Sequence, residues 1–396
     1  MEITKTLTLR LLFTEEQANM AKQHADAKRA CYNWALKESM SEFENAGKRP
    51  SQAELSRRLT VLKNTATAPW WTKVARATLT VAITDLDQAY QRFFRVQKEG
   101  VKFTDKVKQK AARQKRKLTP YDMKGHPKFK KRENDRLSFY ARYDRLAIRG
   151  NTLCLETIGR VSFRSSIEIP SESKVSNPRA VYINGKWLLR VGVTFQQQEI
   201  DLNDCEMGVD VGIDNLAAVN FGEIDLIYKH VNKEKRIKRL ERRIRITQRA
   251  LSRKVRGSKR YEKTRERLRE YHFHLSCIRL DHIHKITRKI INLRPKRIVL
   301  ETLNVNGMMK NRHLSKAIQS AMLYEIHRQL EYKAKWFGIK VDRVSQFYPS
   351  SKTCSACGAY KKDLKLKERV YKCSCGLEID RDSNAARNLK QYNGKS

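Results

Sequence analysis

Four cysteines near the C-terminal end of the chain form two close pairs. Two residues separate Cys354 from Cys357, one separates Cys373 from Cys375, and a glycine follows each pair directly. Tight glycine-bearing turns of this kind point two thiolates at one ion, and 15 residues separate the pairs. The pattern predicts one Zn²⁺, and its role is structural because such knuckles fold only around their metal. The remaining cysteines are scattered singly, as is typical of reduced buried thiols: Cys31, Cys154, Cys205 and Cys277.

Three acidic residues lie where an ionised carboxylate needs a cationic partner. Asp210 lies within the apolar run GVDVGI, Glu301 ends the apolar run IVLE, and Asp382 opens the helical pattern DRDSNAARNL. An unpaired carboxylate in such a strand costs several kcal/mol. Two Mg²⁺ ions about 3.5–4 Å apart, held by carboxylates, would compensate the charges and support phosphodiester hydrolysis. Each acid taken alone also fits a surface position. Asp380 is an equally good helix cap, so the third carboxylate is Asp380 or Asp382, and Asp214 is assigned to a turn.

Basic residues concentrate in one helical stretch. Residues 233–260 contain 14 lysines or arginines against Glu234 and Glu241. A solvated helix face, the alternative, normally carries acids at i±4, and here they are nearly absent. The pattern therefore predicts contacts with nucleic-acid phosphates. The candidate residues come from this stretch and from a basic segment upstream: Arg239, Arg242, Arg243, Arg249, Lys254, Arg256, Lys128, Lys130 and Lys131.

Alternating and helical periodicities indicate the elements that position these residues. Residues 3–13 alternate like a strand, and Thr14 with Gln17 forms a capping-box start for helices over 15–98. A basic loop or extended arm is expected over 100–131, and short strands over 137–195, which the opening strand joins. Two strands with a tight turn between them follow from Met207. The remaining expectations are a basic helical hairpin over 230–294, strands over 296–302 and 339–344, and helices over 315–336 and 382–392.

Several aromatic residues of the helical region recur at helical spacing. Base stacking is one possible role, but side chains with this spacing belong more often to a core. We therefore predict a core role for this set: Trp70, Trp71, Tyr90, Phe93 and Phe94.

Composition narrows the function further. The 396 residues carry 84 lysines and arginines against 42 acids, an excess of 42 that self-repels unless a polyanion neutralises it. No apolar run approaches the roughly 18 residues of a membrane span, and the N-terminus lacks the apolar core of a secretory signal. The sequence predicts a cytoplasmic, nucleoid-associated protein that binds nucleic acid and no membrane.

These motifs together resemble the TnpB (OrfB) proteins of bacterial insertion sequences. GVDVGIDNLA is similar to the first nuclease motif of that family and IVLETLNVNGM to the second. The segment from YPSSKTCSACG through YKCSCGLEIDRDSNAARNL is similar to the zinc finger joined to the third motif, and GHPKFKKRENDRLSFY to the stretch that leads into the family's β-barrel module. The resemblance covers most of the chain and is densest from Gly125 onward.

The resemblance implies an α+β multidomain fold. Residues 1–14 and 125–204 would form a wedge-like β-barrel, into which a helical recognition region with the basic arm, 15–124, is inserted. Residues 205–351 and 379–396 would form a RuvC-like nuclease domain with an RNase H fold, and 352–378 its four-cysteine zinc finger.

The resemblance also implies an activity and partners. The chain would be an RNA-guided, Mg²⁺- or Mn²⁺-dependent DNA endonuclease that cleaves double-stranded target DNA next to a short protein-read motif. Its guide RNA would come from the transposon end, its catalytic triad would be Asp210, Glu301 and Asp382, and its Zn²⁺ ligands would be the four paired cysteines. Two alternatives stay open: a nuclease-inactive, RNA-guided DNA-binding repressor, and a transposase that catalyses DNA strand transfer.

Overall fold

The computed structural model describes residues 2–65, 69–100, 103–132, 137–142, 144, 146, 148–165, 169, 173–197, 200–365 and 368–393. The chain divides into two compact units, 2–197 and 198–396, and each is described by itself. None of the helices in the described ranges is long and apolar enough to cross a membrane.

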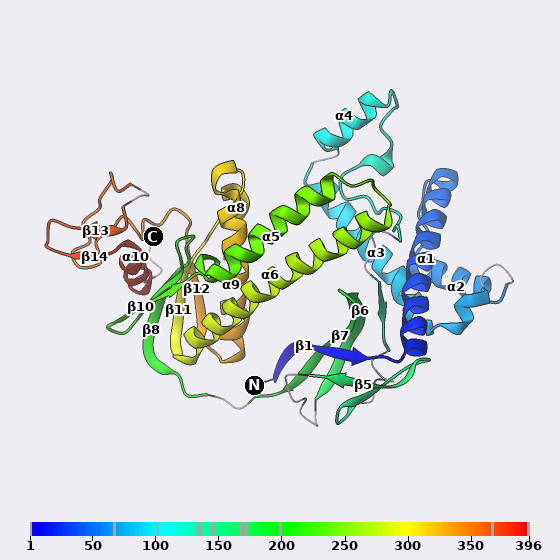
Figure 1. Cartoon of the computed structure of the whole chain (residues 1–396), viewed down its shortest axis with the longest axis horizontal. Helices are drawn as coiled ribbons and strands as arrows, with labels where there is room; N and C mark the ends of the chain where they lie inside the picture. The colour runs from blue at the N-terminus through cyan, green and yellow to red at the C-terminus, as the bar shows by residue number, and fades with distance from the viewer. Residues whose placement is uncertain are drawn as a thin grey trace. The chain divides into compact units, whose positions relative to one another are not determined.

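Helices make up one part of the first unit (Figure 1). The capping box is confirmed, because the Thr14 hydroxyl accepts from the Gln17 amide and the Gln17 side chain accepts from the Thr14 amide. Trp71, Tyr90 and Phe93 belong to the core between the helices, as predicted, whereas Trp70 and Phe94 are 42% and 52% exposed. The elements are α1 (Glu15–Ala46), α2 (Gln52–Lys63), the short 3₁₀ turn η1 (Pro69–Lys73), α3 (Arg76–Lys98), α4 (Asp105–Arg113) and the 3₁₀ turn η2 (Pro120–Asp122).

The expected loop over 100–131 is partly wrong, because α4 is a helix. Thr104 precedes it in an extended conformation, Asp105 lies in its first turn, and Ala111 is buried. An acid in the first turn and basic residues in the last complement the helix dipole, so the charge run is compatible with a helix. Residues 101 and 102 of this segment, and 133–136 just after it, lie outside the described residues.

Seven strands of the first unit form one sheet in the order β2-β6-β7-β1-β5-β4-β3. The opening strand joins it as predicted, since β1 pairs antiparallel with both β7 and β5. The predicted barrel stays a prediction, because β2 and β3, the two ends of the order, are not paired in the described part of the chain. The strands are β1 (Glu2–Leu12), β2 (Ser138–Tyr140), β3 (Ile148–Arg149), β4 (Thr152–Leu155), β5 (Gly159–Arg164), β6 (Lys174–Ile183) and β7 (Lys186–Gln196).

A five-stranded mixed sheet organises the second unit, in the order β10-β9-β8-β11-β12. Its strands are β8 (Asn203–Asp210), β9 (Asn215–Phe221), β10 (Ile224–Lys229), β11 (Pro295–Glu301) and β12 (Lys340–Val344). The first three are antiparallel neighbours, whereas β11 is parallel to both β8 and β12. The tight turn predicted after the first strand connects β8 to β9.

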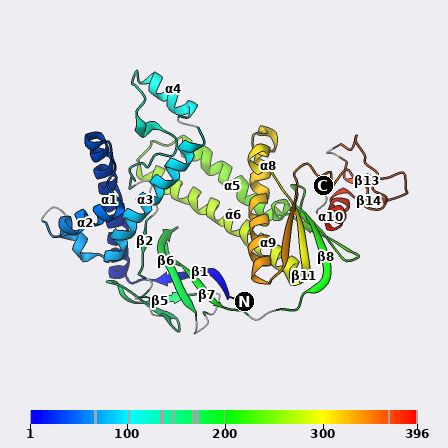
Figure 2. The same cartoon turned by 180° about the vertical axis from the view of Figure 1, so that it is seen from behind.

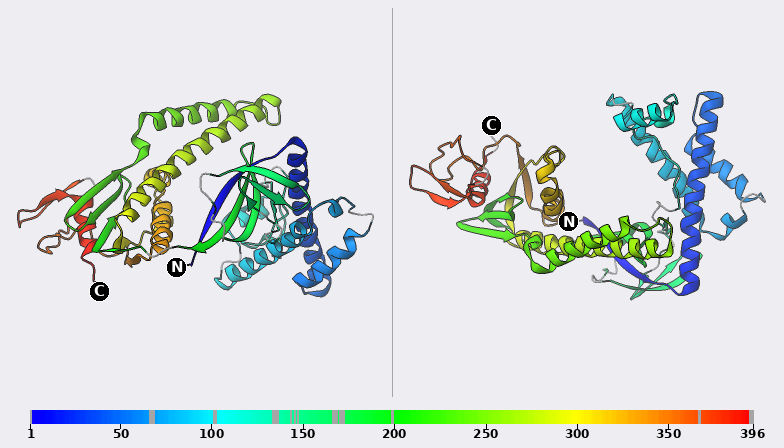
Figure 3. Two further views of the ribbon diagram at one scale, coloured as in Figure 1. Left: turned by 90° about the horizontal axis from the view of Figure 1, so that it is seen from below. Right: turned by 45° about the horizontal axis from the view of Figure 1, so that its top comes forward.

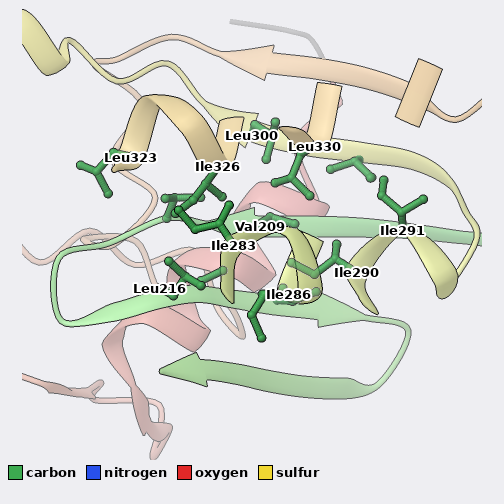
Figure 4. Close-up of a cluster of buried hydrophobic side chains, with 14 of the residues drawn as sticks. Val209, Leu216, Ile283, Ile286, Ile290, Ile291, Leu300, Leu323, Ile326 and Leu330 are labelled. Atoms are coloured by element: carbon green, nitrogen blue, oxygen red, sulfur yellow. The ribbon is translucent and has the colours of Figure 1, made fainter. Parts of the chain in front are cut away.

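Helices cover both faces of this sheet. Successive residues of a strand point to opposite faces, and Leu300 of β11 packs in one apolar cluster with residues of α6 and α9, among them Ile290 and Ile326 (Figure 4). Val299 instead packs with Leu389 of α10 on the other face. The helices are η4 (Val231–Lys233, a 3₁₀ turn), α5 (Lys235–Ser252), α6 (Lys259–Asn292), α7 (Val305–Met308), α8 (Arg312–Ala321), α9 (Leu323–Trp336) and α10 (Arg381–Lys390).

The predicted basic hairpin is confirmed. Helices α5 and α6 pack against each other, and Ile237, Leu240, Ile244 and Leu275 form the apolar seam between them (Figures 1–3). The Ser258 hydroxyl caps α6 by accepting from the Tyr261 amide.

The single helix predicted over 315–336 is wrong, because the chain breaks it at Met322. This residue has the left-handed conformation (φ 54°, ψ 41°), ends α8 and starts α9. The break redirects the chain so that Leu323, Ile326 and Leu330 of α9 are all buried in the apolar cluster. Hydrophobic periodicity does not register a change of helix axis, because both segments keep apolar residues at helical spacing.

Buried His327 on α9 should make the stability of the second unit depend on pH. Burial, and then the positive charge of Arg343, lower its pKa to about 4, and its Nε2 has no hydrogen-bond partner within the described residues. The folded state therefore holds the neutral ring, whereas the unfolded chain takes up a proton near pH 6.5. The free energy of unfolding should therefore fall by about 3 kcal/mol as the pH drops from 6.5 to 4, because protonation of His327 favours the unfolded chain.

Chemical denaturation of wild type and His327→Leu at several pH values tests this expectation. The variant should lose less stability between pH 6.5 and 4 than wild type. Parallel pH curves for the two proteins would contradict it.

Candidate metal centres

Asp210 and Glu301 end two adjacent parallel strands. Leu300 of β11 is in register with Val209 of β8, so the two carboxylates follow at the same edge of the sheet. Strand alternation puts Asp210 on the face of Gly208 and Glu301 on the face of Val299, which is the face that α10 covers. Both residues are half-buried.

Helix α10 brings Asp382 to the same face. The Asp380 carboxylate caps the helix by accepting from the amides of Asp382 and Ser383 at 3.0 and 3.1 Å. Asp382, in the first turn, is only 7% exposed and accepts from Asn215 Nδ2 at 3.0 Å. Asp380 is thus occupied as a cap, and Asp382 is the acid directed into the protein.

Gly208 allows α10 to approach the sheet closely. A Cβ at this position would lie 1.9 Å from the Ala386 carbonyl oxygen and 2.5 Å from the Lys390 amide nitrogen, both backbone atoms of α10. Backbone atoms cannot rotate away, so any side chain here would push the helix, and Asp382 with it, off the sheet.

Gly208→Ala should therefore lower the free energy of unfolding by about 3 kcal/mol, at the upper end of overpacking costs. Gly192→Ala on β7 is the matched control, because the nearest atom there is the rotatable Ser176 hydroxyl at 2.5 Å. Denaturation curves should show a clearly smaller loss for the control. Equal losses would mean that α10 does not depend on Gly208.

The three carboxylates act on one another electrostatically. Burial, then the negative charges of Glu301 and Asp382, raise the pKa of Asp210 well above its ordinary value. Burial also raises the pKa of Glu301, and Asp382 adds to it, whereas the hydrogen bond from the Ser350 hydroxyl opposes the rise. A bound divalent cation would remove this repulsion, and hard carboxylate oxygens suit Mg²⁺ or Mn²⁺.

Polar residues that the sequence did not single out hold this site together. Asn388 of α10 donates to the backbone oxygens of Ser350 and Thr353 at 2.7 and 2.6 Å, and Asn384 donates to Thr353 at 2.7 Å. Ser350 in turn donates to Glu301. Both asparagines are buried and lie four residues apart on α10. The sequence signal that could have identified these two residues is the i, i+4 spacing of the asparagines in NAARN, residues 384–388.

Two arginine side chains lie near the Asp382 carboxylate. Arg381 Nη2 lies 3.5 Å and Arg369 Nη1 3.9 Å from Asp382 Oδ1, and Arg369 Nε lies 3.7 Å from Asp214 Oδ2. Asp214 is also paired with Lys233 at 2.7 Å, in keeping with its predicted place in the turn.

The four paired cysteines form one compact cluster. Their Sγ atoms all lie within 4.8 Å of one another, with 3.7 Å between Cys354 and Cys375 and 3.6 Å between Cys357 and Cys373. Thiolates bound tetrahedrally at about 2.3 Å from Zn²⁺ would be about 3.8 Å apart, so the donor set fits this ion. The Cys375 backbone N–H lowers the pKa of Cys373 to about 6, which favours the thiolate.

Glycines shape both knuckle turns. Gly358 and Gly376 have φ of +75° and +91°, and their amides donate back to the carbonyl oxygens of Cys354 and Cys373. The strands β13 (Val370–Lys372) and β14 (Glu378–Asp380) pair antiparallel around the second turn. Among the described residues, these cysteines are the one group of three or more possible metal ligands gathered so tightly, and the carboxylates are spaced more widely.

The basic residues of the hairpin face solvent. Arg239, Arg242, Arg243, Arg249 and Arg256 are exposed and Lys254 is half-buried, and none is ion-paired with an acid in the described chain. This arrangement leaves their charges available to a polyanion.

The upstream basic residues divide into two kinds. Lys128 and Lys131 are exposed, whereas half-buried Lys130 lies over the Tyr32 ring, with its Nζ 3.9 Å from the ring centroid. The Lys130 backbone also exchanges hydrogen bonds with the Asn33 side chain. Lys130 therefore has a structural role within the first unit.

Comparison with known proteins agrees with this arrangement. Residues 193–312 match the OrfB_IS605 family model described as "Probable transposase", residues 1–48 its "Helix-turn-helix domain", and residues 324–389 the "Cas12f1-like, TNB domain". In the structure, the stretch matched by the helix-turn-helix model is a strand followed by one 32-residue helix.

Relatives extend the match to nearly the whole chain. A protein of Streptomyces pristinaespiralis named "Putative RNA-guided DNA endonuclease" is 28% identical and covers 98% of this chain and 89% of its own length. InsQ of Escherichia coli, with the same description, is 26% identical and covers 93% of this chain and 87% of its own length. The solved mini-RNA-guided endonuclease CRISPR-Cas_phi3 is 10% identical, with a TM-score of 0.50 over 98% of this chain and 92% of that one.

The fold is therefore that of compact CRISPR endonucleases, with a TNB domain that contains the cysteine cluster. Within that class of fold, parts of the sequence are similar to the OrfB_IS605 family and to proteins named TnpB-like, and nearly the whole chain is similar to putative RNA-guided DNA endonucleases.

Proposed function

We propose that this protein is an RNA-guided DNA endonuclease encoded by an insertion sequence. The observation that carries the proposal is the convergence of Asp210, Glu301 and Asp382 on one face of the five-stranded sheet. Burial there, and then the negative charges of Glu301 and Asp382, raise the pKa of Asp210. The sheet order, with three antiparallel strands followed by two parallel ones, suits an RNase H fold of the RuvC type. The whole-chain relatives named as endonucleases support the same activity.

Asp210, Glu301 and Asp382 would hold Mg²⁺ or Mn²⁺, which when bound activates water and stabilises the leaving oxygen in phosphodiester hydrolysis. The chain's own groups orient these ligands. Asn215 fixes one Asp382 oxygen, and Ser350 fixes one Glu301 oxygen. Asp380, as the helix cap, keeps the first turn of α10 in place. Cys354, Cys357, Cys373 and Cys375 would hold a structural Zn²⁺ that folds the segment 352–378.

We assign the remaining parts by the same proposal. The β-rich module, 1–14 and 125–204, and the helical region, 15–124, would bind guide RNA and the target duplex. Residues 205–351 and 379–396 would cleave the DNA. An excess of 42 positive charges suits a protein that binds a long RNA, and base pairing with that RNA would select the target.

The basic hairpin should contribute most of the salt sensitivity of binding. Each neutralised phosphate changes the slope of log affinity against log salt by about −0.7 to −0.9. Replacing the six hairpin residues with glutamine should flatten that slope by up to about 5, without changing which target is chosen, since phosphate contacts position and do not specify. The replaced residues are Arg239, Arg242, Arg243, Arg249, Lys254 and Arg256.

Binding titrations of wild type and the six-residue variant at several salt concentrations measure this slope. An unchanged slope would assign these side chains to a merely solvated face. A changed target preference would mean that they read bases.

Isolation of the protein from its host tests the proposed function itself. A discrete RNA that copurifies and carries a segment matching a DNA site is expected for a guided protein. A transposase acting by strand transfer would instead yield protein without a discrete RNA, together with DNA products newly joined to other DNA.

A further inference from the structure

A groove of about 490 Å³ lies in the second unit between α5, α6 and α8. Its volume falls in the range of small-ligand sites, which is about 300–1,000 Å³. One face of each long helix lines the groove, because the lining residues recur at i, i+3 and i+4. On α5 they are Glu241, Ile244 and Arg245, and on α6 they are His272, Leu275 and Ser276. Ile244 and Leu275 are buried, and with Met322 they give the groove an apolar floor.

A fixed hydrogen-bond network closes one end of the groove. Arg279 donates to Glu241 Oε1 at 2.9 Å and to Asn232 Oδ1 at 2.8 Å. Asn232 in turn donates to the Ser320 carbonyl oxygen at 2.9 Å, which ties α8 to the hairpin. Glu241, the acidic residue of the lining, is thereby neutralised and does not repel an anion.

The rim of the groove carries cations and amides. Arg245 and Lys316 are exposed, and neither is ion-paired with an acid in the part of the chain that the structure describes. Gln248 and Gln319 also line the groove, and their side-chain amides offer both donors and acceptors. An anionic ligand with a flat apolar body and polar edges would satisfy floor, amides and cations together.

We infer that this groove binds one unstacked nucleotide of a single strand. The base lies on the floor of Ile244, Leu275 and Met322, and its edge meets the glutamine amides. The phosphate is bound by Arg245 and Lys316. The inference rests on the proposed function and adds to it a nucleotide subsite apart from the outward face of α5. Arg239 and Arg243 lie on the side of that helix opposite the groove.

Photocrosslinking of the purified complex tests the inference. The guide RNA or one DNA strand at a time is substituted with 4-thiouridine or 5-iododeoxyuridine, and crosslinked peptides are mapped by mass spectrometry. Labelled nucleotides from one strand should crosslink within 241–248, 272–279 or 316–322, and the strand that crosslinks identifies the source. Double replacement of Arg245 and Lys316 with glutamine should weaken binding of that strand by about tenfold and remove the crosslink.

Lys335→Gln, which removes one exposed charge from α9 outside the groove, is the control for loss of charge elsewhere in the unit and should leave the crosslink intact. If the complex still cleaves DNA but all crosslinks lie on the outer face of the hairpin, the groove does not bind a nucleotide, and the proposed function is unaffected. A purified protein without any discrete RNA and without cleavage would overturn both.

Discussion

Asp382→Ala should abolish DNA cleavage while the protein still binds its guide and target. Asp382 is buried, its charge raises the pKa of both Asp210 and Glu301, and it lies on a helix whose cap is a different residue. Without it, the divalent metal loses a ligand, and the cleavage rate should fall by about a thousandfold or more. Asp210→Ala and Glu301→Ala should have the same effect, since the three carboxylates act as one unit.

Asp380→Ala is the matched control, two residues away in the same segment. It removes the cap of α10, which costs about 1 kcal/mol of stability, and should leave most of the cleavage. Single-turnover cleavage and filter-binding assays with all four variants separate chemistry from binding. If the Asp382→Ala variant were active and the Asp380→Ala variant inactive, the third metal ligand would be Asp380 and not Asp382.

Cys373→Ser should remove one Zn²⁺ per chain and unfold the knuckle. Metal binding and folding are one equilibrium in such sites, worth roughly 10–16 kcal/mol in isolated peptides. The loss should extend beyond 352–378, because Asn384 and Asn388 of α10 hold the backbone of Ser350 and Thr353 at the edge of the knuckle. Through Ser350 the disturbance reaches Glu301, so cleavage should decline as well.

Elemental analysis gives the zinc content, and hydrogen exchange locates the unfolded segment. Of the four singly placed cysteines that we predicted to be buried, Cys31 is buried, whereas Cys154, Cys205 and Cys277 are exposed. Cys205→Ser, in the same unit, is therefore a mild control and should retain the metal. Protein prepared without chelators that contains no zinc would refute the structural-zinc assignment.

Local chemistry made much of this architecture predictable. The Thr14 capping box, the β8–β9 turn and the two helices of the hairpin depend on neighbouring residues, and all are present in the structure. The cysteine spacing likewise predicted a cluster, because two tight glycine turns leave the thiolates few other directions.

Features set by tertiary contact were not predictable in the same way. The break at Met322 follows from packing α9 against the sheet, and no residue type in that stretch marks it. Periodicity could not separate Asp380 from Asp382, since either fits a helix start; only the approach of α10 at Gly208 gives them different surroundings. Ser350 and Asn388 act through contacts 49 and 38 residues distant in sequence, which a local pattern does not contain.

Guide-programmed cleavage tests the central claim most directly. The purified protein is loaded with its RNA, and then with an RNA whose targeting segment is exchanged, and each complex is given a plasmid containing both target sites. We predict that the cut moves with the RNA segment, requires Mg²⁺ or Mn²⁺, and is lost in Asp382→Ala although target binding persists. Wild-type protein that binds the programmed site in the presence of Mg²⁺ but leaves both DNA strands intact would contradict the account.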